Sequence, residues 1–163
     1  MSQSTAQPTT ETVLPDRIED MAHLEELLSR PNRTARQGLA GLDSDLLVLG
    51  VGGKMGPSLA RMAVRTLAEM ESPYRVYGVA RFSQPGLRQE LEAAGVETIA
   101  CDLLDREKLA GLPDSRNVIF MAGQKFGTTG NQSMTWALNS FLPGLICERF
   151  ADARIVAFST GNV

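Results

Sequence analysis

Histidine and cysteine are scarce in this sequence of 163 residues. It has one histidine, His23, and two cysteines, Cys101 and Cys147, which are far apart and form no CxxC or metal-ligand spacing. A histidine-based zinc site is therefore implausible, and no metal site is predicted. A soluble chain with reduced cysteines in the cytoplasm is the default expectation.

Long apolar runs and an excess of basic charge are also absent. No apolar run approaches the roughly 20 residues that span a bilayer, and residues 1–12 lack the basic and apolar regions of a signal peptide. The net charge of −3 gives no indication of a nucleic-acid surface. Neither membranes nor nucleic acids are expected partners. The content of 43% hydrophobic and 21% charged residues is typical of a globular domain and excludes an intrinsically disordered protein.

The first 44 residues divide into two segments. Residues 1–12 are almost all small or polar, which predicts a disordered tail. Residues 13–44 are expected to hold a helix and a linker. Asp16 and Glu19 have the spacing of a capping box, apolar residues then recur every three or four positions from Ile18 to Leu28, and Pro31 ends the pattern. Residues 31–44 are expected to form a polar connection.

Strands and helices alternate from residue 45 onward. Short apolar runs predict strands at residues 45–49, 75–80, 96–100, 117–122 and 154–158. Helical patterns lie between them: one runs to Glu71, and others cover residues 85–94, 105–110 and 132–150, with a kink at Pro143. This alternation indicates an α/β fold with a doubly wound parallel sheet. The right-handed crossover rule favours the Rossmann strand order 3-2-1-4-5 for residues 45–163.

A glycine-rich turn joins the first of these strands to the following helix. Glycine allows positive φ and close approach of a pyrophosphate, and a helix N-terminus offers free N–H groups and partial positive charge. The turn differs from a P-loop because Met55 follows Lys54. A purely structural turn and a solvated Lys54 are the alternatives. The predicted cofactor contacts in the turn are Gly50, Gly52, Gly53, Lys54, Met55 and Gly56.

The end of the second predicted strand indicates which nicotinamide cofactor is bound. A Rossmann domain that binds NAD usually has an acidic residue there to bind the ribose diol, whereas a basic residue suits a 2′-phosphate. This sequence has Arg81 and Ser83, and no acidic residue between Val76 and Gln89. We therefore expect NADP(H) to be preferred to NAD(H). The alternative is that Arg81 is a solvated strand end.

These features together resemble the NAD-dependent epimerase/dehydratase family of the extended short-chain dehydrogenase/reductase superfamily, over residues 45–163. The motif GxxGxxG matches its cofactor turn, and residues 101–105 resemble its D-L-x-D segment. The resemblance implies that Asp102, with Leu103, contacts adenine and that Ala122 and Gly123 line the cofactor. Asn139 takes the place of the family's helix asparagine. The alternatives are that Asp102 caps the next segment and that Asn139 is an ordinary polar position.

The resemblance also implies an oxidoreductase acting on a hydroxyl or keto substrate, with nucleotide sugars as one candidate class. Thr160, with Ser159 as the alternative, takes the place of the family's catalytic Ser/Thr, unless the two belong to an ordinary strand-end turn. The family's catalytic YxxxK pair is absent, because the only tyrosines are Tyr74 and Tyr77.

Two hypotheses account for the missing pair. The chain is either an N-terminal piece of a longer enzyme, truncated before the last strands, or a short NADP(H)-binding sensor without catalysis. In both cases the fifth strand is expected to be an exposed edge. We therefore expect marginal stability or association into a homo-oligomer.

Overall fold

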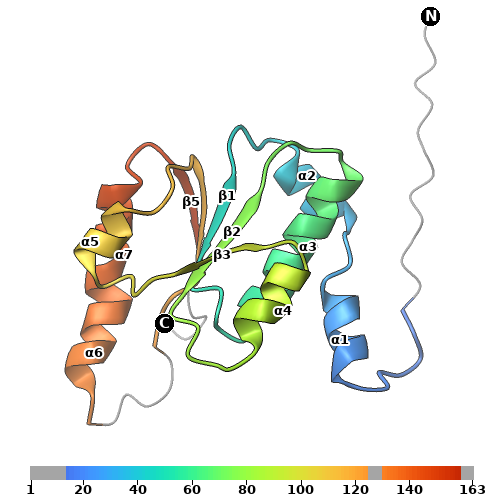
Figure 1. Ribbon diagram of the computed structural model, residues 1–163, viewed down its shortest axis with the longest axis horizontal. Helices are drawn as coiled ribbons and strands as arrows, with labels where there is room; N and C mark the ends of the chain where they lie inside the picture. The colour runs from blue at the N-terminus through green and yellow to red at the C-terminus, as the bar shows by residue number, and fades with distance from the viewer. Residues whose placement is uncertain (1–13, 125–129, 159–163) are drawn as a thin grey trace, which may run out of the picture.

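Five parallel strands form a single sheet in the order β3-β2-β1-β4-β5 (Figure 1). The computed structural model describes residues 14–124 and 130–158, so the predicted tail (residues 1–12) and the candidates Ser159 and Thr160 lie outside the described residues. The strands are β1 (Leu46–Leu49), β2 (Val76–Ala80), β3 (Glu97–Ala100), β4 (Asn117–Phe120) and β5 (Arg154–Ala157). The predicted Rossmann-type α/β class and strand order are confirmed.

The position of β1 at the centre of the sheet explains why its sequence is apolar at every position. All four of its residues are buried, and their side chains alternate between the two faces of the sheet. Leu46 and Val48 belong to one core cluster, while Leu47 and Leu49 belong to the other. The fold therefore has two hydrophobic cores separated by the sheet, as expected for a parallel sheet covered on both faces.

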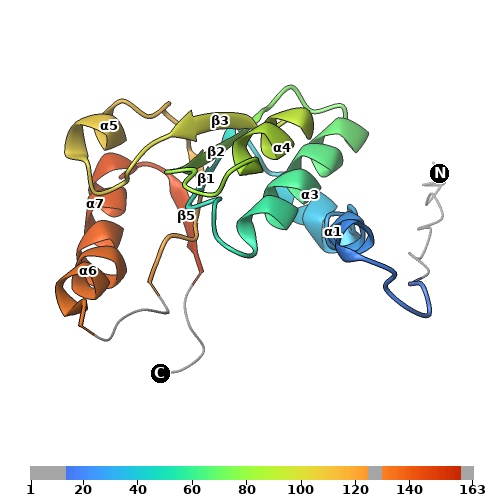
Figure 2. The ribbon, with the colours of Figure 1, turned by 60° about the horizontal axis from the view of Figure 1, so that its bottom comes forward.

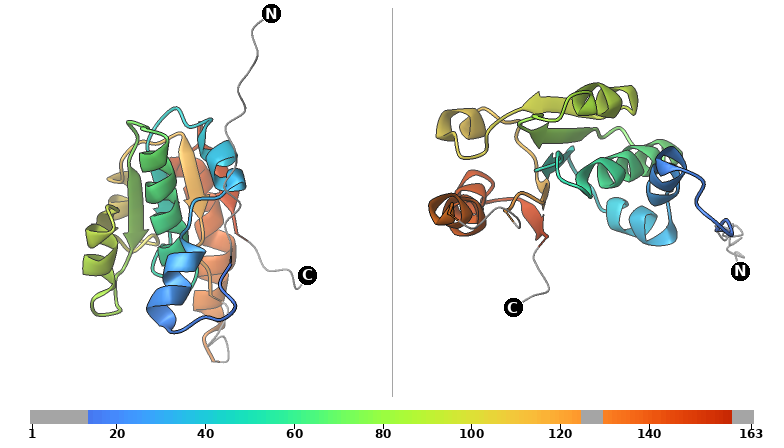
Figure 3. Two further views of the ribbon diagram at one scale, coloured as in Figure 1. Left: turned by 90° about the vertical axis from the view of Figure 1, so that its right-hand side faces the viewer. Right: turned by 90° about the horizontal axis from the view of Figure 1, so that it is seen from below.

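Helices cover both faces of the sheet (Figures 2 and 3). On one side lie α3 (Gly56–Glu69) and α4 (Leu87–Ala93), and on the other lie α5 (Arg106–Ala110), α6 (Gln132–Trp136) and α7 (Leu142–Arg149). A π-helical segment, η1 (Ala137–Phe141), joins α6 to α7. The backbone stays helical from η1 into α7, so Pro143 lies inside a continuous helix, two residues after the π-helical segment ends. The helix is therefore irregular next to Pro143, and the kink itself stays a prediction.

Two helices precede the sheet. In α1 (Met21–Leu28) the cap is Asp20, whose carboxylate accepts a hydrogen bond from the His23 N–H at 2.7 Å, so the prediction that Asp16 caps this helix is wrong. The second helix, α2 (Arg33–Leu39), lies within the segment predicted as a polar connection, which corrects that prediction. Asn32 caps α2 by accepting a hydrogen bond from the Ala35 N–H at 2.9 Å.

Ion pairs attach α1 to α3. Arg61 pairs with Glu25, and Arg65 on the next turn contacts Glu26 at 3.3 Å and the Ser29 hydroxyl at 2.9 Å. No residue of α1 itself is buried. The helix is therefore held on the outside of the domain by charged groups. Among the described helices, none has the length and apolar character needed to cross a membrane.

Candidate functional site

The turn between β1 and α3 contains two glycines that the fold itself requires. Gly50 has a φ of +89°, and a Cβ atom there would lie 2.6 Å from the backbone nitrogen of Ala122. A Cβ atom at Gly56 would lie 2.1 Å from the carbonyl oxygen of Val51. A side chain at either position would collide with backbone atoms. These two glycines are explained by the close packing of β1, β4 and α3.

The other two glycines of the turn face more open space. A Cβ atom at Gly53 would meet only the Gly50 carbonyl oxygen, at an ordinary contact distance of 3.6 Å. At Gly52 the nearest atom would be the Cβ of Ala80 at 3.2 Å, which is tight without being prohibitive. Packing therefore does not require glycine at position 53. A ligand that approaches the backbone closely would account for it.

Several backbone N–H groups in this turn are available to a ligand. Within residues 14–124 and 130–158, the N–H groups of Gly52, Lys54 and Met55 have no hydrogen-bond acceptor. They precede α3, a helix of 14 residues, whose first turn adds partial positive charge. This arrangement suits an anionic group such as a pyrophosphate.

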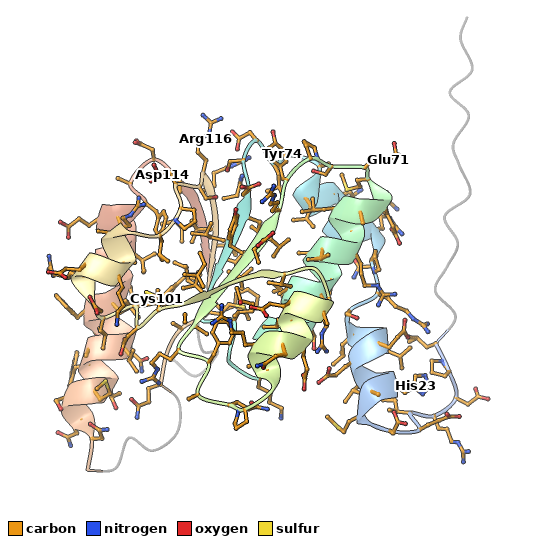
Figure 4. The ribbon with its side chains drawn as sticks, viewed as in Figure 1. His23, Glu71, Tyr74, Cys101, Asp114 and Arg116 are labelled. Carbon is orange, nitrogen blue, oxygen red and sulfur yellow. The ribbon has the colours of Figure 1, made fainter. Side chains whose placement is uncertain are left out.

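A cavity of about 270 Å³ opens beside this turn. Figure 4 labels Tyr74, two residues before β2, and Arg116, directly before β4, at the end of the sheet where the strands begin. The cavity lies at the other end, where ligands bind in open α/β sheets. Residues at the ends of four strands and residues of three helical segments line it: Gly50, Gly52 and Gly53 after β1; Ala80, Arg81, Phe82, Ser83, Gln84 and Leu87 at and after β2; Cys101, Asp102, Leu103 and Leu104 after β3; Met121, Ala122 and Gly123 after β4; and Met134, Leu138 and Leu142 from α6, η1 and α7.

Arg81 brings positive charge to the mouth of this cavity. It is exposed, and it forms no ion pair or hydrogen bond with any residue that the structure describes. Arg61 and Arg65, by contrast, are engaged by carboxylates. Asp102 is the one acidic residue that lines the cavity in the described part of the chain. The guanidinium of Arg81 is therefore free to bind an anionic group of a ligand.

The next residue, Phe82, has a backbone conformation that is rare for an aromatic residue. Its φ is 49°, in the left-handed region that favours glycine and asparagine. Its side chain is half-buried, packs against the core cluster on the α3 side and lines the cavity. Such a conformation costs about 1–3 kcal/mol and is found most often at functional sites.

Asp102 and Cys101 form the wall beyond β3 (Figure 4 labels Cys101). Asp102 accepts a hydrogen bond from the Leu104 N–H at 3.1 Å, so one carboxylate oxygen is used within its own turn. Burial raises the pKa of the Cys101 thiol, and the nearby Asp105 and Asp102 carboxylates raise it further. The thiol is therefore protonated at neutral pH and is unsuited to act as a nucleophile.

Asn139 forms hydrogen bonds with the loop after β4 and does not itself line the cavity. Its Nδ2 donates to the Gln124 carbonyl oxygen at 2.9 Å, and its Oδ1 accepts from the Gln124 N–H at 2.8 Å. A Cβ atom at Gly123 would lie 3.2 Å from the same Oδ1. The asparagine of the π-helical segment thus holds the backbone that follows Ala122 and Gly123.

The structure brings most of the predicted cofactor residues to one cavity. Those that line it are Gly50, Gly52, Gly53, Arg81, Asp102, Leu103, Ala122 and Gly123. Lys54, Met55, Gly56 and Asn139 are beside it without lining it. Neither Phe82 nor the apolar lining from α6, η1 and α7 was predicted from the sequence. The helical spacing of apolar residues in 132–150 could have indicated that this lining faces the cavity. No group of three or more possible metal ligands occurs among the residues described.

Comparison with known proteins identifies the fold. Three solved structures match 70–74% of this chain: an L-threonine dehydrogenase from Clostridium difficile (16% identity, TM-score 0.52), an A-type ketoreductase from a modular polyketide synthase (25%, 0.54) and an ADP-L-glycero-D-manno-heptose-6-epimerase from Helicobacter pylori (18%, 0.55). The chain shares their Rossmann-like fold. It spans 35%, 30% and 43% of their respective lengths. No family model matches the sequence, and no curated protein matches it.

Proposed function

We propose that this chain is the NAD(P)-binding domain of an oxidoreductase of the epimerase/dehydratase type, and that it prefers NADP(H). The observation that carries the proposal is the combination of Gly53 and Arg81 at one cavity. The first leaves room for a ligand where the fold needs no glycine, and the second is a free cation where a 2′-phosphate would lie. The printed names of the three fold neighbours, a dehydrogenase, a ketoreductase and an epimerase, are in keeping with this proposal.

The lining residues suggest how the cofactor would be held. The free N–H groups of Gly52 and its neighbours would bind the pyrophosphate, and Arg81 with Ser83 would bind the 2′-phosphate. Asp102 and Leu103 would contact adenine. When bound, a nicotinamide cofactor supplies a hydride donor or acceptor. For the substrate we propose a small molecule with a hydroxyl or keto group, nucleotide sugars being one candidate class. Thr160, or Ser159, would contact its oxygen.

One observation favours a second candidate, a module that binds NADP(H) without catalysis. The only tyrosines of the sequence are Tyr74 and Tyr77, and neither lines the cavity. Tyr74 lies at the opposite end of the sheet, where the strands begin (Figure 4). A proton donor of the kind that dehydrogenases of this fold use would therefore have to come from elsewhere.

Titration of the purified chain with NADPH and with NADH, followed by fluorescence or calorimetry, tests the cofactor proposal. Arg81→Ala is expected to weaken NADPH binding by about ten- to a hundredfold, as for a lost hydrogen bond to a charged group, and to leave NADH binding unchanged. Arg33→Ala is the matched control, because Arg33 is an exposed arginine on α2 that does not line the cavity. A folded chain that binds neither nucleotide would overturn the proposal.

Turnover by this chain would rule out the module that binds NADP(H) without catalysis. The chain is mixed with NADP⁺ or NADPH and with hydroxyl or keto compounds, including nucleotide sugars, and the absorbance of the reduced nicotinamide is followed. Saturable NADPH binding without any change in absorbance is expected of both candidates, because this sequence contains no YxxxK pair. Oxidation or reduction of the cofactor that disappears in Gly53→Ala favours the enzyme.

A further inference from the structure

The ring of Phe82 is anchored although its backbone is strained. The φ of 49° lies in the left-handed region, which is rare for an aromatic residue. The side chain is half-buried and packs against the core cluster that contains Val51 of the glycine turn and Leu87 of α4. Packing of the ring therefore helps to hold the backbone in this conformation, because an extended backbone at Phe82 would direct the ring elsewhere.

The left-handed conformation decides which residues reach the cavity after β2. In an extended segment, successive side chains point to opposite sides. Here the five consecutive residues from Ala80 to Gln84 all line the cavity. Phe82 is the one residue among these five that has a positive φ. The chain therefore turns at Phe82 and follows the wall of the cavity.

This turn brings three polar side chains to the same cavity. Arg81, Ser83 and Gln84 are exposed and line it, and their side chains form no hydrogen bond or ion pair with any residue that the structure describes. A guanidinium, a hydroxyl and an amide can all donate hydrogen bonds, and the guanidinium accepts none. The set therefore suits a phosphate better than the diol of an unmodified ribose.

The residues after β2 also lie next to the glycine turn. A Cβ atom at Gly52 would lie 3.2 Å from the Cβ of Ala80, the residue directly before Arg81. The free N–H group of Gly52 is one of those that would bind the pyrophosphate. A nucleotide with one phosphate on the 2′ oxygen and a pyrophosphate on the 5′ oxygen of the same ribose needs two neighbouring anion sites of this kind.

We propose that Phe82 is a positioning residue that sets the preference for NADP(H), and that Gln84 is a further donor to the 2′-phosphate. This inference rests on the proposed function and adds two residues to the proposed phosphate site. Phe82 acts through its neighbours: its left-handed backbone directs Arg81, Ser83 and Gln84 to one cavity. An extended backbone at position 82 would turn part of this set away from the ligand.

Two substitutions at Phe82 test the role of its backbone. Valine is β-branched and strongly disfavours the left-handed conformation, whereas asparagine adopts it readily. The quantity to measure is the ratio of the NADH Kd to the NADPH Kd. We expect Phe82→Val to lower this ratio about tenfold or more and Phe82→Asn to keep it within about threefold of the original value. A purely structural defect would weaken both nucleotides equally and leave the ratio unchanged.

The matched control is Phe141→Val, because Phe141 is an exposed phenylalanine of η1 that does not line the cavity. This variant should keep the original ratio. Circular dichroism shows whether each variant is folded. If Phe82→Val does not fold, Phe82→Leu takes its place in the comparison with Phe82→Asn, because leucine also disfavours the left-handed conformation.

A substitution of nearly equal size tests Gln84. Gln84→Glu replaces a donor with a carboxylate that repels the 2′-phosphate, so the ratio of the NADH Kd to the NADPH Kd should fall about tenfold or more. Gln89→Glu is the control for the change of charge, because Gln89 is exposed on α4 and does not line the cavity. Equal ratios for these two variants would overturn the role of Gln84.

The results distinguish this inference from the proposed function. A folded original chain that binds neither nucleotide overturns the proposed function, and this inference with it. Equal binding of NADPH and NADH by the original chain overturns the cofactor preference and the role of Phe82 together. An original chain that prefers NADPH, with a folded Phe82→Val that keeps the same preference, overturns the role of Phe82 and leaves the proposed function in place.

Discussion

Asn139 and Gln124 are joined by two hydrogen bonds that use both ends of the asparagine amide. The bonds connect the π-helical segment η1 to the loop that leaves the cavity after β4. The asparagine amide has both a donor and an acceptor, so it binds both the carbonyl oxygen and the N–H of Gln124. No other side chain of similar size offers both groups in this way.

Asn139→Ala should therefore destabilise the chain by about 1 kcal/mol, since the two bonds are solvent-exposed and each contributes modestly. Urea unfolding followed by circular dichroism measures this loss. Asn131→Ala is the control, because the Asn131 side chain forms no capping hydrogen bond at the start of α6. Equal midpoints for the two variants would show that the contact with Gln124 contributes nothing to stability.

The glycines of the β1–α3 turn should respond differently to alanine. Gly56→Ala forces a Cβ atom against the Val51 carbonyl and should cost about 3 kcal/mol or more. Gly53→Ala should fold with nearly unchanged stability, because its Cβ atom meets only an ordinary contact. It should nevertheless weaken NADPH binding about tenfold or more, because the methyl group occupies the approach to the backbone. Thermal unfolding and nucleotide titration of both variants separate the two effects.

At Phe82, the backbone conformation should affect the stability of variants more than the hydrophobicity of the side chain does. Leucine keeps an apolar side chain yet retains the cost of the left-handed conformation, whereas asparagine accepts that conformation readily. We expect Phe82→Asn to be at least as stable as Phe82→Leu, the reverse of what burial alone predicts. The comparison needs only the urea midpoints of the two variants. A clearly more stable leucine variant would mean that the left-handed backbone carries little cost.

Asp43 should make stability depend on pH in the acid range. Its hydrogen bond with Arg116 lowers its pKa below the usual 3.8, with further lowering from Asn117 and Arg154. A carboxyl with a lowered pKa stabilises the folded state fully above pH 3.8, and this contribution is lost as the pH falls through the folded value. Asp43→Asn should therefore be less stable than the original chain at neutral pH and equally stable in strong acid.

Chemical denaturation at several pH values measures that difference. Asp152→Asn is the control, because Asp152 has no ion pair or hydrogen bond with any described residue. Its difference from the original chain should stay small and constant with pH. If Asp43→Asn still differs in stability from the original chain at a pH below the pKa of Asp43 in the folded state, the substitution has an effect other than the loss of charge.

The sheet was predictable from sequence because β1, β2 and β4 consist mostly of apolar residues, although β3 (ETIA) and β5 (RIVA) contain polar ones. Gly50 with its neighbours marks the start of the next helix. The strand order followed from the crossover rule. Helix α2 was missed because its one large apolar residue, Leu39, makes no apolar stripe, although Leu39 packs against the core cluster on the α3 side. An ion pair between Arg36 and Glu69 at 2.7 Å adds a contact that no sequence pattern reveals. The left-handed conformation of Phe82 has no residue signature, because an aromatic residue rarely adopts it. Pro143 indicated an irregular helix, but not that the irregularity would be a π-helical segment.

The ion pairs of Arg61 and Arg65 make the attachment of α1 more sensitive to salt than the packing of the sheet is. Dissolved salt screens exposed charges and hardly affects buried apolar contacts. Concentrated salt would therefore loosen α1 from the domain while the sheet and its two cores stay folded. A protease added under those conditions would cut the chain near Ser29 and leave the cavity beside the β1–α3 turn intact.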